Sequence, residues 1–373
     1  MKFCFFGEIS ESLKGHTKGG GELQVALLAK ALALKGHEVV IVDPCSSESF
    51  ITDEGIKLIN LPDWNKGIRG LRLFFNRIPA LRKLLISQKA DYYYVRMRSY
   101  LHLIPYRAAR KNGSKFILGI ACDLDVLSFR KKFNYEYKTN FNLFKFLTIH
   151  IPGDIAHSFL LRNSDYDILQ HSGQSFGSSR LKSNQFVFPN IMEQSNVPWV
   201  SNPSGDYFLF AGTLTMLKGA DNLLKLINIV NDSIPIMVVG LPWGEKPEKI
   251  YEELKKKKNV TLKGRKNHKE TLELISNAKA LINTSYYEGF SNVFLEAWAT
   301  GVPVISLNVN PGDVLNKYNL GICCGGDLHR MKQCIESDET ATLDKSKLIS
   351  YVSEFHNFDT AADRFLNILN NSS

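Results

Sequence analysis

Short apolar runs alternate with stretches of helical spacing through the first half of the chain. The run at 2–6 predicts a buried strand, and the run at 39–42 predicts a second one. Between them, apolar residues recur on one helix face at Val25, Leu28, Ala29 and Leu32. Further apolar runs of strand length cover 92–95, 115–120 and 168–170. Because strands that alternate with helices favour parallel pairing, we expect an α/β domain with a parallel sheet.

The composition changes between Ser195 and Asp206, where Asn, Ser, Pro and Gly dominate, and we interpret this stretch as a linker. A second strand–helix–strand pattern begins at Tyr207. Its first helix carries on one face Ala220, Leu223, Leu224 and Ile227. Its expected strands cover 208–211, 236–239, 260–262, 280–283 and 302–306. The second half is therefore expected to contain another parallel sheet.

A chain of 373 residues and 42.1 kDa is too long for one ordinary domain, which indicates two domains with a cleft between them. Apolar residues make up 44% and charged residues 22%, a balance typical of globular proteins. The six cysteines form no CxxC pair and no Cys/His ligand spacing, so we expect neither disulfides nor a zinc site. The first apolar run is too short for a signal peptide, and no later run approaches a membrane span. A cytoplasmic location is the expectation.

Positive charge is concentrated in the first half. The net charge is +9, and residues 1–195 hold 27 basic against 17 acidic residues. Two segments, 64–89 and 129–146, combine basic side chains with aliphatic or aromatic ones, which suits an anionic membrane surface. The alternative for 64–89 is an ordinary helix that packs its apolar stripe on the sheet, restarted at Pro79. A nucleic-acid partner is disfavoured because no recognition motif accompanies the charge.

Three loops have the composition of anion sites. The first is Gly19-Gly20-Gly21, which precedes a helix starting near Glu22. Glycines there would let main-chain amides approach a phosphate, although a flexible turn is the alternative. The spacing differs from the G-x-G-x-x-G of dinucleotide enzymes, so a dehydrogenase is disfavoured.

The second loop runs from Gly212 to Gly219 and places Lys218 at the start of a helix. A lysine there opposes the helix dipole, which costs stability unless an anion lies beside it. A solvated surface lysine is the alternative.

The third loop follows the expected strand 280–283 and ends in Glu288-Gly289-Phe290. Ser291 is a suitable N-cap for the next helix, so the amides of Asn292 and Val293 would face the strand ends, where open α/β sheets bind ligands. The alternative is a surface glutamate followed by a second one, Glu296, on a helix face.

Taken together, these loops resemble the retaining glycosyltransferases of family 4, also called group 1. The resemblance rests on the element from Glu288 to Glu296 with the following Gly301-Val302-Pro303, on Gly212 through Gly219, and on Gly19 to Glu22. It implies the GT-B fold, in which two Rossmann-like α/β domains face each other across a cleft. The domains would cover 1–200 on the acceptor side and 201–354 on the donor side, with a crossover helix at about 355–373.

The resemblance also implies roles for single residues. Glu296 would hold the nucleotide ribose, Glu288 would face the donor sugar, and Lys218 would bind the diphosphate. Gly20 and Gly21 would meet the diphosphate from the opposite domain. The other donor-binding positions implied are Gly212, Thr213, Gly264, Arg265, Gly289, Phe290, Ser291, Asn292 and Val293, with Gly264 and Arg265 beside the base. No metal and no cofactor is implied.

Two positions depart from the family pattern. Thr213 stands where the family usually has arginine, and Ala121-Cys122-Asp123 follows a strand after which a histidine is usual. Either change would alter the acceptor chemistry or weaken the site. In this family a departing phosphate oxygen can accept the acceptor's proton, so no separate base is required, and the sequence offers no clear candidate for one.

We therefore expect a cytoplasmic retaining glycosyltransferase that moves a sugar from a nucleotide sugar to a glycan acceptor. The acceptor is expected to be lipid-linked and to belong to cell-surface polysaccharide biosynthesis, with the enzyme peripheral on the inner membrane face. The alternative is a noncatalytic member of the same fold that binds nucleotide sugar or acts as a scaffold. A sugar-nucleotide epimerase of similar architecture is a more distant possibility.

Overall fold

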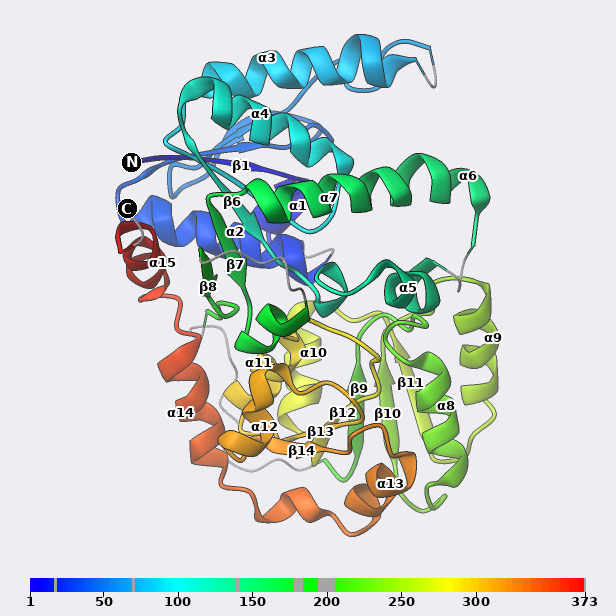
Figure 1. Ribbon diagram of the computed structural model, residues 1–373. Helices are drawn as coiled ribbons and strands as arrows, with labels where there is room; N and C mark the ends of the chain where they lie inside the picture. Colours follow the sequence, from blue (N-terminus) through cyan, green and yellow to red (C-terminus); the bar gives the residue numbers. More distant parts are fainter. Residues whose placement is uncertain (17–18, 69–70, 138–140, 178–183, 194–204, 372–373) are drawn as a thin grey trace. The chain divides into compact units, whose positions relative to one another are not determined.

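The computed structural model describes the chain except for 17–18, 69–70, 138–140, 178–183, 194–204 and 372–373. The described residues form two compact units, each with its own parallel sheet (Figure 1). The first unit consists of Met1–Val126, Asn142–Ile191 and Phe358–Ser373. The second consists of Leu127–Phe141 and Met192–Asn357. Most of the expected linker at 195–206 lies outside the described residues.

The first unit is built on an eight-stranded sheet with the order β3-β4-β2-β1-β5-β6-β7-β8. All neighbouring strands are parallel except β3 and β4. The strands are β1 (Lys2–Phe6), β2 (Glu38–Val42), β3 (Phe50–Ile51), β4 (Lys57–Ile59), β5 (Tyr92–Arg96), β6 (Lys115–Gly119), β7 (Tyr166–Leu169) and β8 (Gln185–Val187). The main helices are α2 (Gly20–Leu34), α3 (Ile78–Gln88), α4 (Leu103–Asn112), α7 (Ile151–Asn163) and α15 (Ala361–Asn370).

Helices cover both faces of this sheet because successive side chains of a strand point to opposite sides. On β1, Phe3 and Phe5 enter the core under α2 and α15, which includes Phe365. Cys4 and Phe6 enter the opposite core, which is covered by α3, α4 and α7. The last helix α15 therefore belongs to the first unit, although it ends the chain.

The second unit is built on a six-stranded parallel sheet with the order β11-β10-β9-β12-β13-β14. Its strands are β9 (Phe208–Ala211), β10 (Ile236–Val239), β11 (Val260–Gly264), β12 (Ala280–Asn283), β13 (Val304–Ser306) and β14 (Gly321–Cys323). Leu209 of β9 faces a core with the helices α10 (His268–Ser276), α11 (Asn292–Ala299) and α14 (Lys345–Phe355). Phe208 and Phe210 face the other core, with the helices α8 (Ala220–Ile229), α9 (Glu245–Leu254) and α13 (Leu328–Glu336).

The predicted strands agree closely with those observed. The runs at 208–211, 236–239 and 280–283 are strands over those same residues, whereas the run predicted at 168–170 overlaps only the end of β7, which begins at Tyr166 and ends at Leu169. The strands β3, β4, β8 and β14 were not predicted. Each has two or three residues, too few for a recognisable alternation of apolar and polar positions.

The segment 64–89 combines features of both interpretations of the sequence. Helix α3 begins at Ile78 with Pro79 at its start, and Leu81 and Leu85 are buried in the core as in an ordinary surface helix. The π-helix η1 (Leu73–Arg77) precedes it and buries none of its residues. The second basic tract, 129–146, divides between the two units at Asn142. None of the described helices is long and apolar enough to cross a membrane.

Candidate functional site

The two loops with the strongest sequence signals lie at the carboxyl ends of neighbouring strands. In the second sheet β9 is the neighbour of β12, and the chain continues from β9 to one side and from β12 to the other. The Lys218 loop follows β9 and the Glu288 loop follows β12. Open α/β sheets bind ligands at such a reversal of strand order. Sheet topology thus brings together two loops that are distant in the sequence.

Main-chain contacts hold these two loops against each other. Gly219 has φ +69°, and a Cβ atom there would lie 1.9 Å from the carbonyl oxygen of Thr284. The Thr284 hydroxyl donates to the Gly219 carbonyl at 3.0 Å, and the Tyr286 amide donates to the Leu217 carbonyl at 2.9 Å. Gly219 is therefore required both by its backbone conformation and by the close approach of the second loop.

Lys218 and Glu288 form an ion pair in which Nζ lies 2.7 Å from Oε2. The Glu288 side chain is 7% exposed, and its Oε1 accepts hydrogen bonds from Ser285 Oγ at 2.6 Å and from Asn283 Nδ2 at 2.9 Å. Burial by itself would raise the pKa of Glu288, but the Lys218 ammonium and the two hydrogen bonds outweigh it and lower the pKa. Glu288 is therefore an ionised carboxylate in a fixed orientation.

The anion that the sequence predicts beside Lys218 is, within the protein, the Glu288 carboxylate. The Lys218 side chain remains 38% exposed, so it can contact a second anion. The neighbouring loop residues Gly212 and Thr213 follow β9 directly; Thr213 is exposed. Asn283 and Ser285, which orient Glu288, were not singled out in the sequence, because nothing in their spacing indicates that they turn back onto the carboxylate.

Helix α11 begins at Asn292, as expected, with Ser291 at the N-cap position. One detail of the expectation was wrong, because the Ser291 side chain makes no capping hydrogen bond. The ring of Phe290 packs against Trp298 and His356 in the core, so only its main chain is available to a ligand. Gly289 is buried, whereas Asn292 and Val293 are half-buried at the start of the helix.

Glu296, one turn into α11, is paired with a residue that the sequence analysis missed. His268 Nε2 lies 3.1 Å from Glu296 Oε1. The hydrogen bond to Glu296 raises the pKa of His268; desolvation opposes this, and the charge of Glu296 adds to it. His268 is the first residue of α10, where Asn267 and Glu270 form a capping box. That Asn-x-x-Glu pattern could have placed the start of the helix, although not its contact with Glu296.

Gly264 and Arg265 lie at the carboxyl end of β11. Gly264 ends the strand with φ +64°, and its carbonyl accepts a hydrogen bond from the Gly240 amide at 2.8 Å. The Arg265 side chain is exposed. Both residues are thus at the same edge of the second sheet as the Lys218 loop.

Gly20 and Gly21 belong to the first unit, where they begin α2 after β1. A Cβ atom on Gly21 would lie 2.9 Å from the sulfur of Met97, which follows β5 and has φ +72°. Since β1 and β5 are neighbours, this glycine lies at the reversal of strand order in the first sheet. Its approach to a ligand held by the second unit stays a prediction.

A network of polar side chains occupies the carboxyl edge of the first sheet, beyond β5 and β6. Arg98 donates to Asp125 at 2.7 Å and to Asp154 at 2.9 Å. At the position where the histidine of the family is absent, Asp123 accepts a hydrogen bond from His171, which follows β7. His171 was not predicted as a site residue, since strand order alone brings it beside Asp123.

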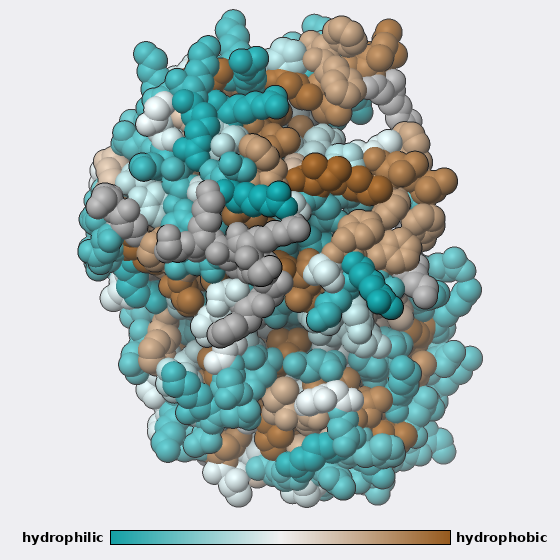
Figure 2. Space-filling model, viewed as in Figure 1, coloured by the Kyte–Doolittle hydropathy of each residue, from teal (hydrophilic) through white to brown (hydrophobic). Residues whose placement is uncertain are grey.

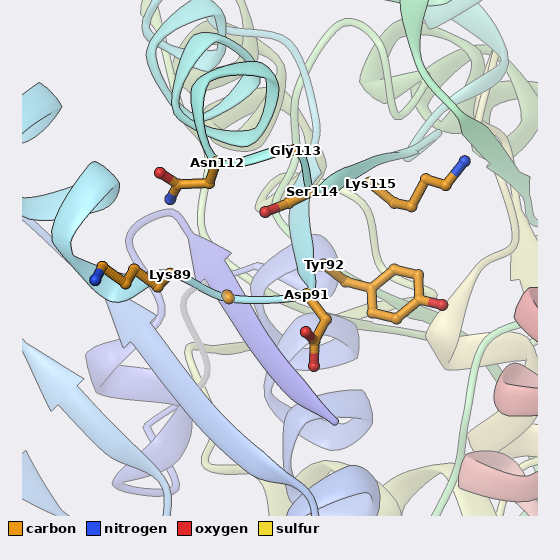
Figure 3. Close-up of a pocket in the computed structure, with 8 residues that line it drawn as sticks. Lys89, Asp91, Tyr92, Asn112, Gly113, Ser114 and Lys115 are labelled. Carbon is orange, nitrogen blue, oxygen red and sulfur yellow. The ribbon is translucent and has the colours of Figure 1, made fainter.

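A cavity of about 450 Å³ lies elsewhere in the first unit, between Lys89–Tyr92 and Asn112–Lys115 (Figure 3). These residues precede or begin β5 and β6, so the cavity is at the amino edge of the sheet. It is therefore separate from the carboxyl edge at which the loops described above lie. Among the described residues, no group of His, Cys, Asp and Glu side chains has the arrangement of a metal site.

Comparison with known proteins identifies the second unit. Residues 192–327 match the family model described as glycosyl transferases group 1. Comparison with curated protein sequences gave no match.

Several solved structures share the fold. Sucrose-phosphate synthase from Thermosynechococcus elongatus has a TM-score of 0.78 at 16% identity, over 100% of this chain and 98% of that chain. HepE from Anabaena, in complex with UDP and glucose, has a TM-score of 0.71 at 14% identity over 100% of both chains. WaaG, a glycosyltransferase involved in lipopolysaccharide biosynthesis, has a TM-score of 0.70 at 15% identity over 98% of both chains.

The structural matches establish the GT-B fold, which confirms the α/β fold expected from the sequence. The family match confirms the resemblance to group 1 at the residues that carry its main motifs, the Lys218 loop and the Glu288–Glu296 element. The chain accordingly contains a glycosyl transferases group 1 domain at residues 192–327, and the protein is a glycosyltransferase of the GT-B fold.

Proposed function

We propose that this glycosyltransferase transfers its sugar with retention of configuration to a glycan acceptor in cell-surface polysaccharide biosynthesis, and that the acceptor is lipid-linked. The Lys218–Glu288 pair at the carboxyl ends of β9 and β12 is the observation that carries the proposal. UDP and glucose are bound by HepE, and WaaG acts in lipopolysaccharide biosynthesis, which supports a nucleotide diphosphate sugar as donor and a surface glycan as product.

The proposed donor site lies in the second unit. Lys218 and the first amides of α11 bind the diphosphate, because a helix N-terminus and an ammonium both attract phosphate. Glu288 faces the donor sugar and Glu296 holds the ribose. The backbone at Gly264 and Arg265 lies beside the base, and Gly20 and Gly21 contribute amides from the first unit. Thr213 occupies the position of the family's arginine, so in this proposal Lys218 supplies the main side-chain charge at the leaving group.

The chemistry follows from the charges that develop. When the bond between sugar and phosphate breaks, negative charge grows on the diphosphate and positive charge on the sugar carbon. Lys218 and the α11 amides stabilise the first charge. The ionised Glu288 carboxylate, held by Ser285 and Asn283, stabilises the second. With retention, the acceptor attacks the face that the diphosphate leaves, and a departing phosphate oxygen can take the acceptor's proton.

Nucleotide release from a panel of UDP-, GDP- and ADP-sugars tests the proposal. We expect one base to be preferred and Glu288→Gln to lose release while its thermal unfolding midpoint is kept. Glu245→Gln, which removes an exposed carboxylate of the same unit, serves as the matched control and should remain active. Nucleotide binding without release by the wild-type protein would favour the noncatalytic alternative. An NMR spectrum showing inverted anomeric configuration in the product would contradict retention.

The proposed lipid-linked acceptor is supported by apolar side chains exposed on the first unit. Four lie in or just before η1, at Ile68, Leu71, Phe74 and Phe75. Four lie in or beside α6 (Leu143–Lys145) and the following π-helix η5 (Phe146–His150), at Leu143, Phe144, Leu147 and Ile149. Figure 2 shows apolar surface over the start of α3 and over α6.

Large apolar side chains are unfavourable when they are exposed to water. Phe75 is 73% exposed and Phe144 is 75% exposed. Burying one such side chain in an apolar environment contributes about 1.5–3 kcal/mol. Lys66, Arg72 and Lys145 lie within or beside the same segments and add attraction to anionic headgroups. We propose that the first unit binds the inner, anionic face of a membrane through these two segments, which would bring a lipid-linked acceptor to the enzyme.

A further inference from the structure

A hydrogen-bonded network of polar side chains crosses the carboxyl edge of the first sheet and ends on Asp123. It begins at Arg96 at the end of β5, which donates to Asn190 Oδ1 at 2.9 Å. Gln170, after β7, donates to the same oxygen at 2.8 Å. Gln174 Oε1 accepts a hydrogen bond from the main-chain amide of Gln170 at 2.8 Å, and Gln174 Nε2 donates one to Asp123 Oδ1 at 3.0 Å. Side chains at or after the ends of β5, β7 and β8 thus form a network that reaches the Asp123 carboxylate, which follows β6.

Asp123 is held rigidly yet remains open to a ligand. His171 Nε2 lies 2.9 Å from Asp123 Oδ1, the same oxygen that Gln174 contacts. Because a carboxylate accepts only, the histidine donates this hydrogen bond. Asp123 is 32% exposed, whereas the His171 side chain is only 8% exposed. In the described part of the chain no hydrogen bond reaches Asp123 Oδ2, so this oxygen can accept one from a bound molecule.

The side chains that support Asp123 are deeply buried. His171 Nδ1 is buried and has no hydrogen-bond partner among the described residues. A buried polar atom without a partner costs about 1–3 kcal/mol, so proteins seldom retain one without a reason. Gln170, Gln174 and Asn190 are each 4% exposed or less, and the network they form orients a single outward carboxylate. A purely structural network would not need to end at the surface.

The charge of this edge determines which ligand it suits. This edge has two cations in the network: Arg96 binds Asn190, and Arg98 is paired with both Asp125 and Asp154. With Asp123 the edge carries more negative than positive charge, which repels a diphosphate and favours neutral hydroxyl groups. A carboxylate oxygen is a strong acceptor for the hydroxyls of a sugar.

We propose that Asp123 Oδ2 binds a hydroxyl group of the sugar acceptor, and that His171 and Gln174 position its carboxylate. This rests on the proposed function, in which the first unit holds the acceptor. Asp123 takes the place of the histidine that is absent from this strand end, and His171, contributed by the next strand, supports it.

The test measures the binding of the sugar acceptor and the binding of the nucleotide-sugar donor separately. Nucleotide release is measured with the preferred nucleotide sugar alone, and then with octyl glycosides of glucose, galactose, mannose and N-acetylglucosamine as acceptor probes. For Asp123→Asn we expect the KM of the stimulating glycoside to rise about tenfold or more, since the hydrogen bond from a sugar hydroxyl to a charged carboxylate is lost. The KM of the nucleotide sugar and its slow hydrolysis without acceptor should change less than about twofold, since the donor site of the second unit is intact.

Variants of the supporting residue distinguish positioning from folding. His171→Gln keeps an N–H donor near Asp123 and should retain a KM for the glycoside close to that of the wild-type enzyme. His171→Leu removes the donor and should raise this KM toward the value for Asp123→Asn. Asp91→Asn is the matched control, because Asp91 binds the Lys2 amide at the amino edge of the same sheet. It should leave both KM values unchanged.

Several outcomes would overturn the inference while leaving the proposed function intact. One is an unchanged glycoside KM in Asp123→Asn; another is a rise confined to the nucleotide sugar. A third is a wild-type enzyme that releases nucleotide but responds to none of the glycosides. If no nucleotide sugar is turned over by the wild-type enzyme, it is the proposed function that fails.

Discussion

Lys218 Nζ lies 2.7 Å from Glu288 Oε2, which joins a residue that follows β9 to one that follows β12. The carboxylate is buried and the ammonium is half-buried, so each charge depends on the other. A negatively charged ligand at the exposed side of Lys218 would interact with the same ammonium group as Glu288. The pair therefore couples the stability of the second unit to the binding of the donor.

Removing either member of this pair should reduce turnover. In Glu288→Gln and in Lys218→Met we expect kcat to fall about 100-fold or more, the usual effect of losing a group that stabilises developing charge. The double variant should lose little beyond the larger single effect, since both residues act as one unit. Additive losses, measured as kcat for nucleotide release, would contradict the coupling.

Lys218→Met should also destabilise the protein more than Glu288→Gln does. It leaves the Glu288 charge buried without its partner, which costs about 3–5 kcal/mol when both groups are buried. Because the Lys218 side chain is 38% exposed, we expect about 1–3 kcal/mol here. Urea unfolding followed by tryptophan fluorescence measures this loss, and an unchanged midpoint for Lys218→Met would argue against it.

Gly219→Ala should disrupt the junction of the two loops. The added Cβ would lie 1.9 Å from the Thr284 carbonyl oxygen, so the backbone must move. Gly113→Ala is the matched control, because Gly113 has the same φ of +69° and open space around it. We expect about 1–2 kcal/mol for the control from the left-handed backbone alone, and a clearly larger loss for Gly219→Ala. Equal unfolding midpoints would show that the loops separate easily.

His268 should make donor binding depend on pH. Its pKa is raised above 6.5 because it donates a hydrogen bond to Glu296, so the charged pair is complete below pH 6.5 and is lost as the pH rises through the raised pKa. We expect the KM of the nucleotide sugar to increase across that interval. His268→Gln keeps a hydrogen-bond donor without the titration and should flatten the profile. A wild-type KM that stays constant from pH 6 to pH 9 would contradict the role of His268.

His102 should make the first unit sensitive to acid. Burial, together with the charge of nearby His157, lowers its pKa from 6.5 to about 3, while Asp125 opposes the shift. The folded protein thus binds fewer protons than the unfolded chain between these values, and stability decreases as the pH falls below 6.5. At pH 5 the loss is about 2 kcal/mol, or about 4–8 °C in the unfolding midpoint.

His102→Phe, which keeps a ring beside Phe6, removes this proton uptake. Its unfolding midpoint should therefore fall less between pH 7 and pH 5 than that of the wild-type protein. Differential scanning calorimetry measures both midpoints, and parallel decreases would exclude His102 as the cause.

Membrane binding should require both the apolar and the basic residues of the first unit. Flotation with vesicles containing anionic lipid should carry the wild-type protein upward, and added salt should weaken the binding by screening the charges. The double variant Phe74→Ser with Phe75→Ser should lower the partition coefficient at least about tenfold, since two large apolar side chains are lost. Leu34→Ser, which removes an exposed leucine of helix α2, is the control. Wild-type protein that stays at the bottom at low salt would favour a soluble acceptor.

Most strands, the two-sheet pattern and the loops that carry Lys218 and Glu288 could be predicted from the sequence. These features depend on local periodicity and on residues close in the chain, such as Ser291 just before α11 or Pro79 in the first turn of α3. The sequence also identified the basic apolar segment 64–89. It could not tell which of its apolar residues are buried, because the periodicity continues from the exposed Phe75 into the buried Leu81.

The contacts between side chains of the site, in contrast, depend on the packing of the whole sheet. The pairs Lys218–Glu288, His268–Glu296 and His171–Asp123 each join residues that are distant in the sequence. In the first and third pairs the residues follow different strands, and strand order is set by hydrogen bonds and core packing across the whole sheet, which no short window of sequence contains. The expected strands were therefore found to within one or two residues at their carboxyl ends, while the partners of Glu296 and Asp123 were missed.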